Sequence, residues 1–294
     1  MESPKLQLNV GQSIRTRSGN FYRIAQPIGG GKNASAYLTL QTSGINAGNF
    51  CALKVVQDAY NDTNLRRFET EIETLTRLTH PSIMQIVDSG EYNNNDQVYP
   101  FYLSDYYQET LSGALRRGLS LPMKLAFALQ MVSGLAYLEK QDIVHCDVKP
   151  DNVFVRGFDC AIGDFGLVHL PSAGGDDKLG PSLHNYRSPD IAVFNSGGAA
   201  PTSKSDVFQL GLVFTEMFTG VNICQSASSG TDPVKLDSMP DIHGAIGRGI
   251  TNVLDEMLKM NPLERLSASE LIDRWQGLLF TVVEHRWKQE DRIF

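Results

Sequence analysis

Two polar motifs in the middle of the chain flank a predicted β-hairpin. The first reads His145-Cys146-Asp147-Val148-Lys149-Pro150-Asp151-Asn152, and the second, Asp164-Phe165-Gly166, begins twelve residues after Asn152. Between them, the apolar runs 153–155 and 160–162 are separated by a turn sequence, which is the pattern of two short paired strands. Paired strands bring their ends to one edge, so we expect four polar side chains on one rim: Asp147, Lys149, Asn152 and Asp164.

Together the two motifs resemble the catalytic loop, HxDxKPxN, and the metal-binding DFG motif of eukaryotic-like (Hanks-type) serine/threonine protein kinases. The resemblance implies ATP and Mg²⁺, with Mn²⁺ as an alternative metal. It implies that Asp147 accepts the substrate hydroxyl proton and that Lys149 neutralises charge on the transferred phosphate. Asn152 and Asp164 would hold the metal, since Mg²⁺ prefers hard oxygen ligands. Either motif alone would be an ordinary turn sequence, but their combination at this spacing favours catalysis.

The composition is that of a folded protein without a basic surface. A chain of 294 residues suits one large two-lobed domain or two ordinary ones. Hydrophobic residues at 41% and charged residues at 20% argue against wholesale disorder. The net charge of -7 argues against sequence-independent nucleic-acid binding, which needs a basic face. We therefore expect no nucleic-acid partner, although a few cations can still hold a nucleotide.

The cysteines and the apolar segments indicate a reduced, cytoplasmic protein. No signal peptide is apparent near the N-terminus. The apolar run 125–138 is interrupted by Gln130 and is shorter than a membrane span, so it predicts a buried helix and no membrane segment. The cysteines show no CxxC spacing and are expected to be reduced thiols: Cys51, Cys146, Cys160 and Cys224.

A glycine-rich segment follows a strand predicted at 21–25. The segment 28–38 resembles the kinase loop GxGxxGxV, with Ala34 and Ala36 in place of the third Gly and the Val. Glycine lets backbone amides approach phosphate oxygens. Alone, the three glycines would indicate a simple hairpin turn, but the distance to Ala52-Leu53-Lys54-Val55 favours nucleotide binding.

Lys54 lies in an apolar strand, where an unpaired ammonium group would be costly to bury. The alternative is an exposed lysine on the solvent face of the strand. Apolar residues at spacings of three and four predict a helix at 64–78. The register of the resemblance selects Glu71 on this helix as the partner of Lys54 and leaves Glu69 and Glu73 exposed. In the family, this ion pair holds the lysine on the α- and β-phosphates.

The segment 103–107 resembles the linker between the kinase lobes. By this register, the backbone carbonyl of Asp105 and the backbone amide of Tyr107 bind adenine, and the small Ser104 guards the pocket behind it. A shift of one residue would put Leu103 or Asp105 in the place of Ser104. The implied ATP-binding residues are Ile28, Gly29, Gly30, Gly31, Ala36, Ala52, Lys54, Ser104, Asp105, Tyr107 and Phe154.

Three later residues are assigned structural roles by the resemblance. The segment 186–190 resembles the YxAPE end of the activation segment, with Asp190 in place of Glu. The segment 205–211 resembles the SDVWSLG helix, in which Asp206 would hold the backbone of the catalytic loop. Arg265, in the late arginine motif, is expected to pair with Asp190.

The predicted fold is α+β, the bilobal protein-kinase fold, with a small antiparallel sheet and one helix in the N-lobe and a larger, mainly helical C-lobe. Further strands are predicted at 83–87 and 98–103, and helices at 111–117 and 122–141. The predicted domains are an N-terminal extension 1–20, a kinase domain 21–276 (N-lobe 21–104, hinge 105–108, C-lobe 109–276) and a helical C-terminal extension 277–294.

Two departures from the family pattern bear on regulation and substrate choice. Cys146 replaces the arginine that in many kinases receives an activation-loop phosphate, which implies an enzyme of the non-RD type that does not depend on that phosphate. Ser172 and Ser182 stay candidate modification sites. Leu183 stands where serine/threonine kinases usually carry a threonine, which leaves the hydroxyl preference open.

Three functions stay open. The first is a protein kinase that phosphorylates Ser and Thr in protein substrates and in itself; the Lys149-Pro150 pair argues against a dedicated tyrosine kinase. The second is a pseudokinase, an ATP-binding signalling or scaffold module, which the complete set of catalytic residues disfavours. The third is a small-molecule kinase of the antibiotic-phosphorylating type, which the motifs around Asp206 and Arg265 disfavour.

Overall fold

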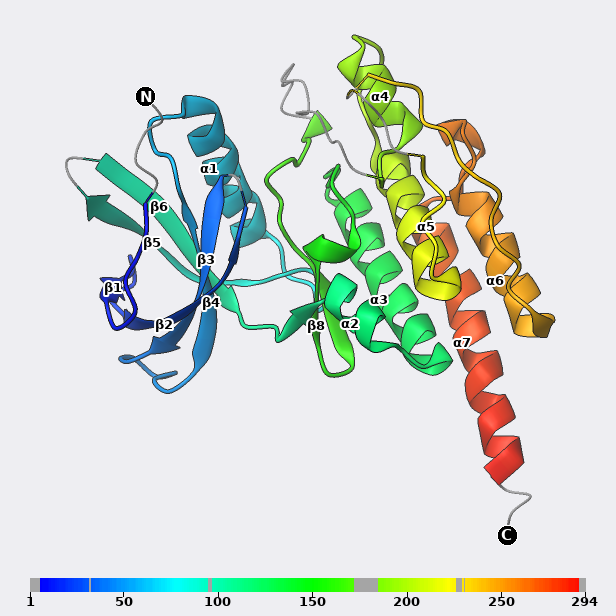
Figure 1. The fold of residues 1–294 in the computed structure, drawn as a ribbon, viewed down its shortest axis with the longest axis horizontal. Coiled ribbons are helices and arrows are strands. Elements are labelled where there is room, and N and C mark those ends of the chain that lie inside the picture. The colour runs from blue at the N-terminus through cyan, green and yellow to red at the C-terminus, as the bar shows by residue number, and fades with distance from the viewer. Residues whose placement is uncertain are drawn as a thin grey trace. The chain divides into compact units, whose positions relative to one another are not determined.

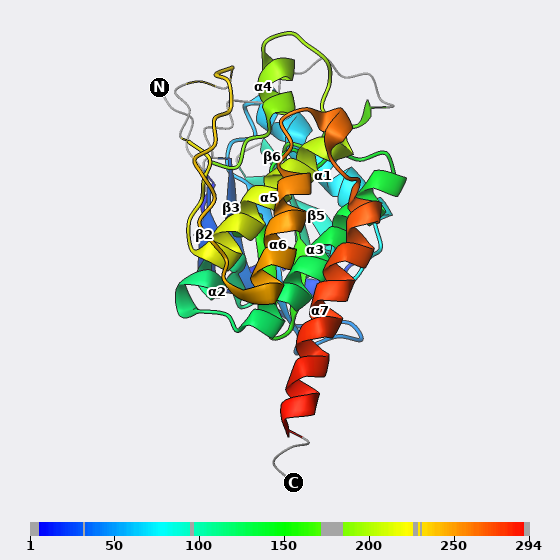
Figure 2. The same ribbon diagram turned by 90° about the vertical axis from the view of Figure 1, so that its right-hand side faces the viewer.

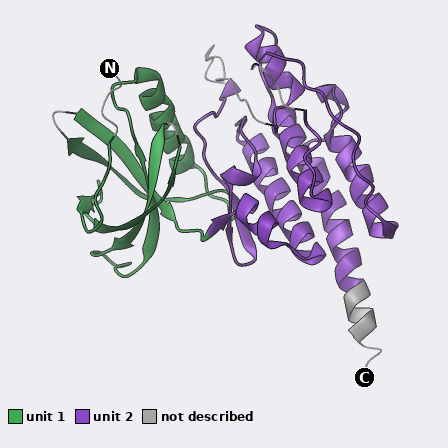
Figure 3. Cartoon of the chain, viewed as in Figure 1, with its two compact units in different colours: residues 1–108 green, residues 109–294 purple. Residues whose placement is uncertain are grey.

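The computed structural model describes residues 6–31, 33–94, 97–171, 185–225, 229 and 231–290, with side chains described as far as residue 284. The chain divides into two compact units, Met1–Gln108 and Glu109–Phe294 (Figure 3). The first unit holds an antiparallel sheet and one helix, and the second is mainly helical. The predicted α+β class, with a small sheet part followed by a larger helical part, is confirmed.

Unit 1 is built on a six-stranded antiparallel sheet (Figure 1). In spatial order, its strands are β1 (Ser13–Arg15), β2 (Phe21–Gly30), β3 (Ala34–Gln41), β4 (Phe50–Val56), β6 (Gln97–Asp105) and β5 (Ile86–Asn94). Alternate residues of β3 are buried, as expected for a strand with one face on a core. The edge strand β1 lies within the range 1–20 that was expected to precede the domain, and Leu6 and Leu8 are buried.

Two strands of unit 1 differ from their predicted ranges. β2 continues past the predicted end at residue 25 as far as Gly30, because Gly29 and Gly30 pair with Ala36 and Ser35 of β3. The strand predicted at 83–87 begins instead at Ile86. The apolar residues at 83 and 84 are buried, but a backbone hydrogen bond from residue 83 to residue 80 closes a turn there. The prediction placed the start of the strand too early, because buried apolar residues in a turn look like those of a strand in the sequence.

Helix α1 (Asp62–Arg77) packs on the sheet of unit 1 and contacts β4, β5 and β6. It begins two residues before the predicted start, because the Asn61 side chain accepts a hydrogen bond from the backbone N–H of Asn64 and caps the helix. Its buried face consists of Phe68, Glu71, Thr74 and Leu75. One carboxylate is thus buried in an otherwise apolar or hydroxyl-bearing face.

Unit 2 combines a helical bundle with a three-stranded sheet. Its helices are α2 (Leu111–Arg117), α3 (Leu121–Lys140), α4 (Pro189–Asn195), α5 (Ser203–Thr219), α6 (Gly244–Met257) and α7 (Ala268–Glu290). The sheet has the order β7 (Glu109–Thr110), β8 (Val153–Arg156) and β9 (Asp159–Ile162), and the 3-10 turns are η1 (Pro150–Asn152) and η3 (Pro262–Glu264). The predicted hairpin is therefore formed by β8 and β9.

Helix α3 is the core helix of unit 2 and contacts α5, α7 and β9 (Figures 1 and 2). Among the described helices, it has the length and apolar composition that a membrane span would need, which the sequence estimate of a shorter run did not anticipate. Half of that apolar window is buried inside the protein, and a core helix meets the same length and composition requirements. The membrane signal is therefore weak.

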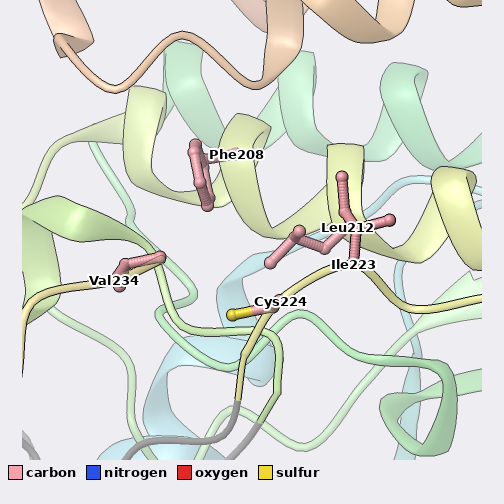
Figure 4. Packing of buried hydrophobic residues seen from close by; sticks show 5 residues of the cluster. All are labelled: Phe208, Leu212, Ile223, Cys224 and Val234. Atoms are coloured by element: carbon pink, nitrogen blue, oxygen red, sulfur yellow. The ribbon is translucent and has the colours of Figure 1, made fainter. Parts of the chain in front are cut away.

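An apolar cluster joins α5 to the segment that follows it. Phe208 and Leu212 of α5 pack with Ile223, Cys224 and Val234 (Figure 4). This packing holds the connection between α5 and α6 against the helix. Helix α7 runs without a break across the predicted domain end at residue 276, and its Trp275 is fully buried against Phe214 and Phe218.

Candidate active site

Lys54 of β4 forms a bidentate ion pair with Glu71 of α1 inside unit 1. Lys54 Nζ donates to both carboxylate oxygens of Glu71, at 2.8 and 2.9 Å. Glu71 is buried, whereas Glu69 and Glu73 are exposed, as the sequence register predicts. The hydroxyl of Tyr102, on β6, donates to Glu71 Oε1 at 2.9 Å. A buried carboxylate needs such partners, because its desolvation would otherwise be costly.

The glycine-rich segment forms the hairpin between β2 and β3. Gly31 lies in the connection, and its N–H donates to the carbonyl of Ala34 at 2.9 Å. Ala36 pairs with Lys54 on the neighbouring strand β4. The two strands of this hairpin and the strand that carries the lysine are thus parts of one sheet.

The predicted adenine-binding residues lie at the end of β6. Ser104 is buried and pairs with Ala52 of β4, which also belongs to the predicted site. The Ser104 hydroxyl donates to the carbonyl of Asp105 at 3.3 Å. This is the carbonyl assigned to adenine, and a carbonyl oxygen has a second lone pair for another donor.

In unit 2, the catalytic-loop residues form one connected cluster. Asp147 Oδ2 accepts a hydrogen bond from Lys149 Nζ at 2.7 Å and another from Asn152 Nδ2 at 2.9 Å. Asn152 Nδ2 also donates to the backbone carbonyl of Asp147 at 2.8 Å. These bonds fix the Asp147 carboxylate and orient the Asn152 amide, whose remaining polar atom, Oδ1, suits a hard cation.

His145 connects this cluster to the DFG motif. Its Nδ1 accepts a hydrogen bond from the N–H of Asp147 at 3.2 Å, and its Nε2 lies 3.0 Å from the carbonyl oxygen of Gly163. The acceptor role of Nδ1 makes Nε2 the protonated nitrogen. Burial lowers the pKa of His145, which agrees with a neutral ring. The ring also packs edge-on against the buried Phe165 at 4.7 Å between centroids.

Two residues of the site have left-handed backbone conformations. Cys146 has φ = 66° and Asp164 has φ = 61°. Each such conformation costs about 1–3 kcal/mol for a residue other than glycine, and it persists where surrounding contacts impose it. At Asp164, the conformation turns the chain two residues after the end of β9.

Asp206 of α5 holds the catalytic loop by its backbone, as predicted. Its carboxylate oxygens accept hydrogen bonds from the N–H groups of His145 at 2.7 Å and Cys146 at 2.8 Å. Burial raises the pKa of Asp206 to about 7, and the two backbone N–H groups act in the opposite direction.

Arg265 and Asp190 form the predicted buried ion pair. Two guanidinium nitrogens of Arg265 donate to the two oxygens of Asp190, at 2.6 and 3.1 Å. The guanidinium also donates to the backbone carbonyls of Lys204, Lys259 and Met260. The shorter Asp190 side chain, in place of Glu, therefore reaches its partner. Ser172, Ser182 and Leu183 lie outside the described residues.

The sequence analysis did not identify three residues that support the candidate site. Tyr102 donates a hydrogen bond to Glu71, and His145 connects the Asp147 cluster to Gly163. Gln209 accepts a hydrogen bond from the backbone N–H of Val148, next to Asp147. Nothing in the sequence around Tyr102, apart from an apolar strand, indicated its contact with Glu71. Gln209 could have been noticed, because it is a polar residue between the apolar residues Phe208 and Leu210 of a helix.

The two residues predicted to hold the metal, Asn152 and Asp164, are of the types that suit magnesium bound to a nucleotide. Among the described residues, no group of three or more His, Cys, Asp or Glu side chains is arranged to hold a metal ion. Asn152 and Asp164 offer an amide and a carboxylate, and Mg²⁺ commonly combines one or two protein oxygens with water and substrate phosphates. Asn152 and Asp164 are therefore the residues that would hold such a metal.

Comparison with known proteins agrees with this geometry. Residues 22–275 match the family model described as protein kinase domain. The chain is 33% identical over 216 residues to serine/threonine-protein kinase PrkC of Bacillus subtilis (strain 168), covering 70% of this chain and 32% of that protein. It is 29% identical over 212 residues to serine/threonine-protein kinase pkn2 of Myxococcus xanthus, covering 68% and 24% of the two chains. The chain thus spans about a third or less of these relatives and, by the match over residues 22–275, belongs to the protein kinase domain family.

Proposed function

We propose that the chain is an ATP- and Mg²⁺-dependent protein kinase that transfers the γ-phosphate to Ser and Thr hydroxyls of proteins. The observation that carries this proposal is the position of Asp147, whose carboxylate is held by Lys149 and Asn152 at hydrogen-bond distance. A pseudokinase would have no need for an oriented base next to a phosphate-neutralising lysine. The similarity to two serine/threonine kinases supports the hydroxyl preference.

In the proposed reaction, the substrate hydroxyl oxygen attacks the γ-phosphorus, and its proton passes to Asp147. The bond between the γ-phosphorus and the bridging oxygen breaks, and ADP leaves. Lys149 neutralises charge on the moving phosphoryl group, and Lys54, held by Glu71, binds the α- and β-phosphates. The metal, held by Asn152 and Asp164, would neutralise charge on the phosphate oxygens when bound.

The activity is tested by incubating the purified chain with γ-labelled ATP, with and without a general protein substrate. We expect label in the chain itself and in the substrate, and no label after EDTA removes the divalent metal. Phosphoserine and phosphothreonine in the product would support the hydroxyl preference. Label that appears only in small molecules would instead support the antibiotic-phosphorylating alternative.

Ser104 gives a test of the adenine-binding register. Because this buried side chain is small, we expect the chain to use ATP analogues enlarged at the adenine amino group as phosphate donors. The variant Ser104→Phe should reject these analogues and keep ATP, since the larger ring fills the space behind adenine. The measurement is the ratio of kcat/KM for the analogue and for ATP. An unchanged ratio in Ser104→Phe would assign the position to Leu103 or Asp105.

We further propose that activity does not depend on a phosphate in the activation segment. Cys146 is buried in an apolar cluster with Val144 and Ile191, against which Leu167 and Phe194 pack. Burial raises the pKa of the Cys146 thiol well above its usual value, so the side chain is neutral. A neutral thiol in apolar surroundings cannot pair with a phosphate, whereas an arginine at this position could.

The variant Ser172→Ala/Ser182→Ala tests this independence. We expect its kcat to stay within about threefold of the wild-type value, because position 146 carries no arginine that a phosphate would have to neutralise. The variant Cys146→Arg serves as the comparison, since it restores a phosphate-binding group. Complete loss of activity in the double alanine variant would show that a phosphate on this segment is required.

The location of the protein in the cytoplasm stays a proposal. The four cysteines are free and buried, which agrees with a reducing compartment. The predicted division into an N-terminal extension, a kinase domain and a C-terminal extension is likewise proposed, with the hinge near the boundary between the two units.

A further inference from the structure

Gln209 of α5 connects the helix to the backbone on both sides of Asp147. Its Oε1 accepts a hydrogen bond from the N–H of Val148 at 3.0 Å, and its Nε2 donates to the carbonyl of Cys146 at 3.1 Å. The Cys146 carbonyl belongs to the peptide group before Asp147, and the Val148 N–H belongs to the peptide group after it. One side chain therefore holds both peptide groups that flank the aspartate.

These hydrogen bonds are closed off from solvent. Gln209 and Cys146 are each 1% exposed, and Val148 is fully buried. Water has no ready access to replace a lost partner, so removing the Gln209 amide leaves a buried donor and a buried acceptor unpaired. The local backbone conformation therefore depends on these two hydrogen bonds of Gln209.

The backbone that Gln209 holds is strained at the residue before Asp147. Cys146 has a left-handed conformation with φ = 66°. Asp206 accepts the N–H groups of His145 and Cys146, and the His145 ring accepts that of Asp147. Gln209 adds the N–H of Val148, so four consecutive backbone donors have side-chain acceptors. Strained conformations persist where contacts over-determine them in this way.

We propose that Gln209 is a positioning residue for phosphate transfer: by fixing both peptide groups around Asp147, it sets the direction of the carboxylate toward the substrate hydroxyl. This inference rests on the proposed function, in which Asp147 takes the hydroxyl proton. In the SDVWSLG motif, which segment 205–211 resembles, the residue at this position is a serine. A serine side chain is too short to reach both peptide groups. The motif alone therefore does not imply these two hydrogen bonds.

The central variant is Gln209→Met, which keeps the side-chain volume and removes both hydrogen bonds. We expect kcat to fall by about 10- to 100-fold, because a misplaced catalytic group loses the advantage of orientation. The KM for ATP should stay within about twofold, since both hydrogen bonds of Gln209 go to the catalytic loop and not to the nucleotide-binding residues of unit 1. A residue that only supported the fold would not produce this split between kcat and KM in the folded variant.

Gln130 of α3 provides a matched control. Its Nε2 donates to the carbonyl of Phe158 at 2.9 Å, and its Oε1 accepts the N–H of Cys160 at 2.7 Å. Gln130 thus also makes one donated and one accepted backbone hydrogen bond in the same unit, but to Phe158 in the turn after β8 and to Cys160 in β9. Gln130→Met should keep the wild-type kcat while losing the same number of hydrogen bonds.

Amide hydrogen exchange at Val148 gives a second readout that needs no catalysis. We expect faster exchange at this amide in Gln209→Met and unchanged exchange in Gln130→Met. If Gln209→Met does not fold, Gln209→Asn keeps the amide but shortens the side chain by one methylene, and the same two effects should appear in it.

The outcomes separate this inference from the proposed function. A wild-type kcat in Gln209→Met, with Asp147→Asn inactive, would overturn the positioning role and leave the kinase assignment standing. A wild-type chain that transfers no phosphate would reject the proposed function, and unchanged exchange at Val148 would then reject the contact itself.

Discussion

We expect Asp147→Asn to lower kcat for phosphate transfer by about 10²- to 10⁴-fold, the usual contribution of a general base. An amide has nearly the shape of the carboxylate but does not accept a proton. The oxygen of the new amide can still accept a hydrogen bond from Lys149, so we expect the fold and ATP affinity to be retained. The measurement combines initial rates with γ-labelled ATP and a direct nucleotide-binding titration.

The control for this variant is Asp159→Asn, which makes the same change on the exposed end of β9. It should have the wild-type rate. If Asp147→Asn labels substrate as fast as the wild type, Asp147 is not the base. If the wild type binds the nucleotide but neither the wild type nor Asp147→Asn transfers phosphate, the chain is an ATP-binding module, as the pseudokinase alternative holds.

Arg265→Met is expected to destabilise unit 2 by about 3–5 kcal/mol, the range for removing one partner of a buried ion pair. The Arg265 side chain is fully buried and Asp190 is 11% exposed, so the remaining carboxylate would be left with little solvent. The variant also removes the hydrogen bonds that Arg265 donates to three backbone carbonyls near α5 and η3. Several buried acceptors therefore lose their donor together.

Urea unfolding followed by tryptophan fluorescence measures this loss in the correct unit, because both tryptophans, Trp275 and Trp287, lie in unit 2. The matched control is Arg117→Met, which breaks an ion pair with Glu109 whose side chains are 57% and 30% exposed. Exposed pairs contribute at most about 1 kcal/mol. Equal losses in the two variants would contradict the importance of the buried pair.

Local sequence patterns were sufficient for the elements and for most of the polar partners. The apolar runs 153–155 and 160–162, with the turn sequence between them, identified β8 and β9, and apolar spacing identified α1 to within two residues. The pairs Lys54 with Glu71 and Arg265 with Asp190 were accessible because each lies in a motif whose spacing is characteristic of the family.

Other features depended on contacts that have no local signature. The start of β5 at Ile86 was not visible, because buried residues in a turn and in a strand look alike in sequence. The contact of Tyr102 with Glu71 joins β6 to α1, and that of Gln209 with Val148 spans 61 positions. Which polar groups meet in a protein interior is decided when the elements pack.

The sequence by itself therefore determined the order of the elements and the family, and it predicted a set of catalytic side chains. The family motif also indicated that Asp206 holds this loop, whereas only the tertiary structure decided the left-handed conformation of Cys146 and the two hydrogen bonds that Gln209 of α5 makes on either side of Asp147. The physical reason is that periodicity and turn chemistry act between neighbours along the chain, whereas a buried donor or acceptor must be satisfied by whatever group packing brings next to it.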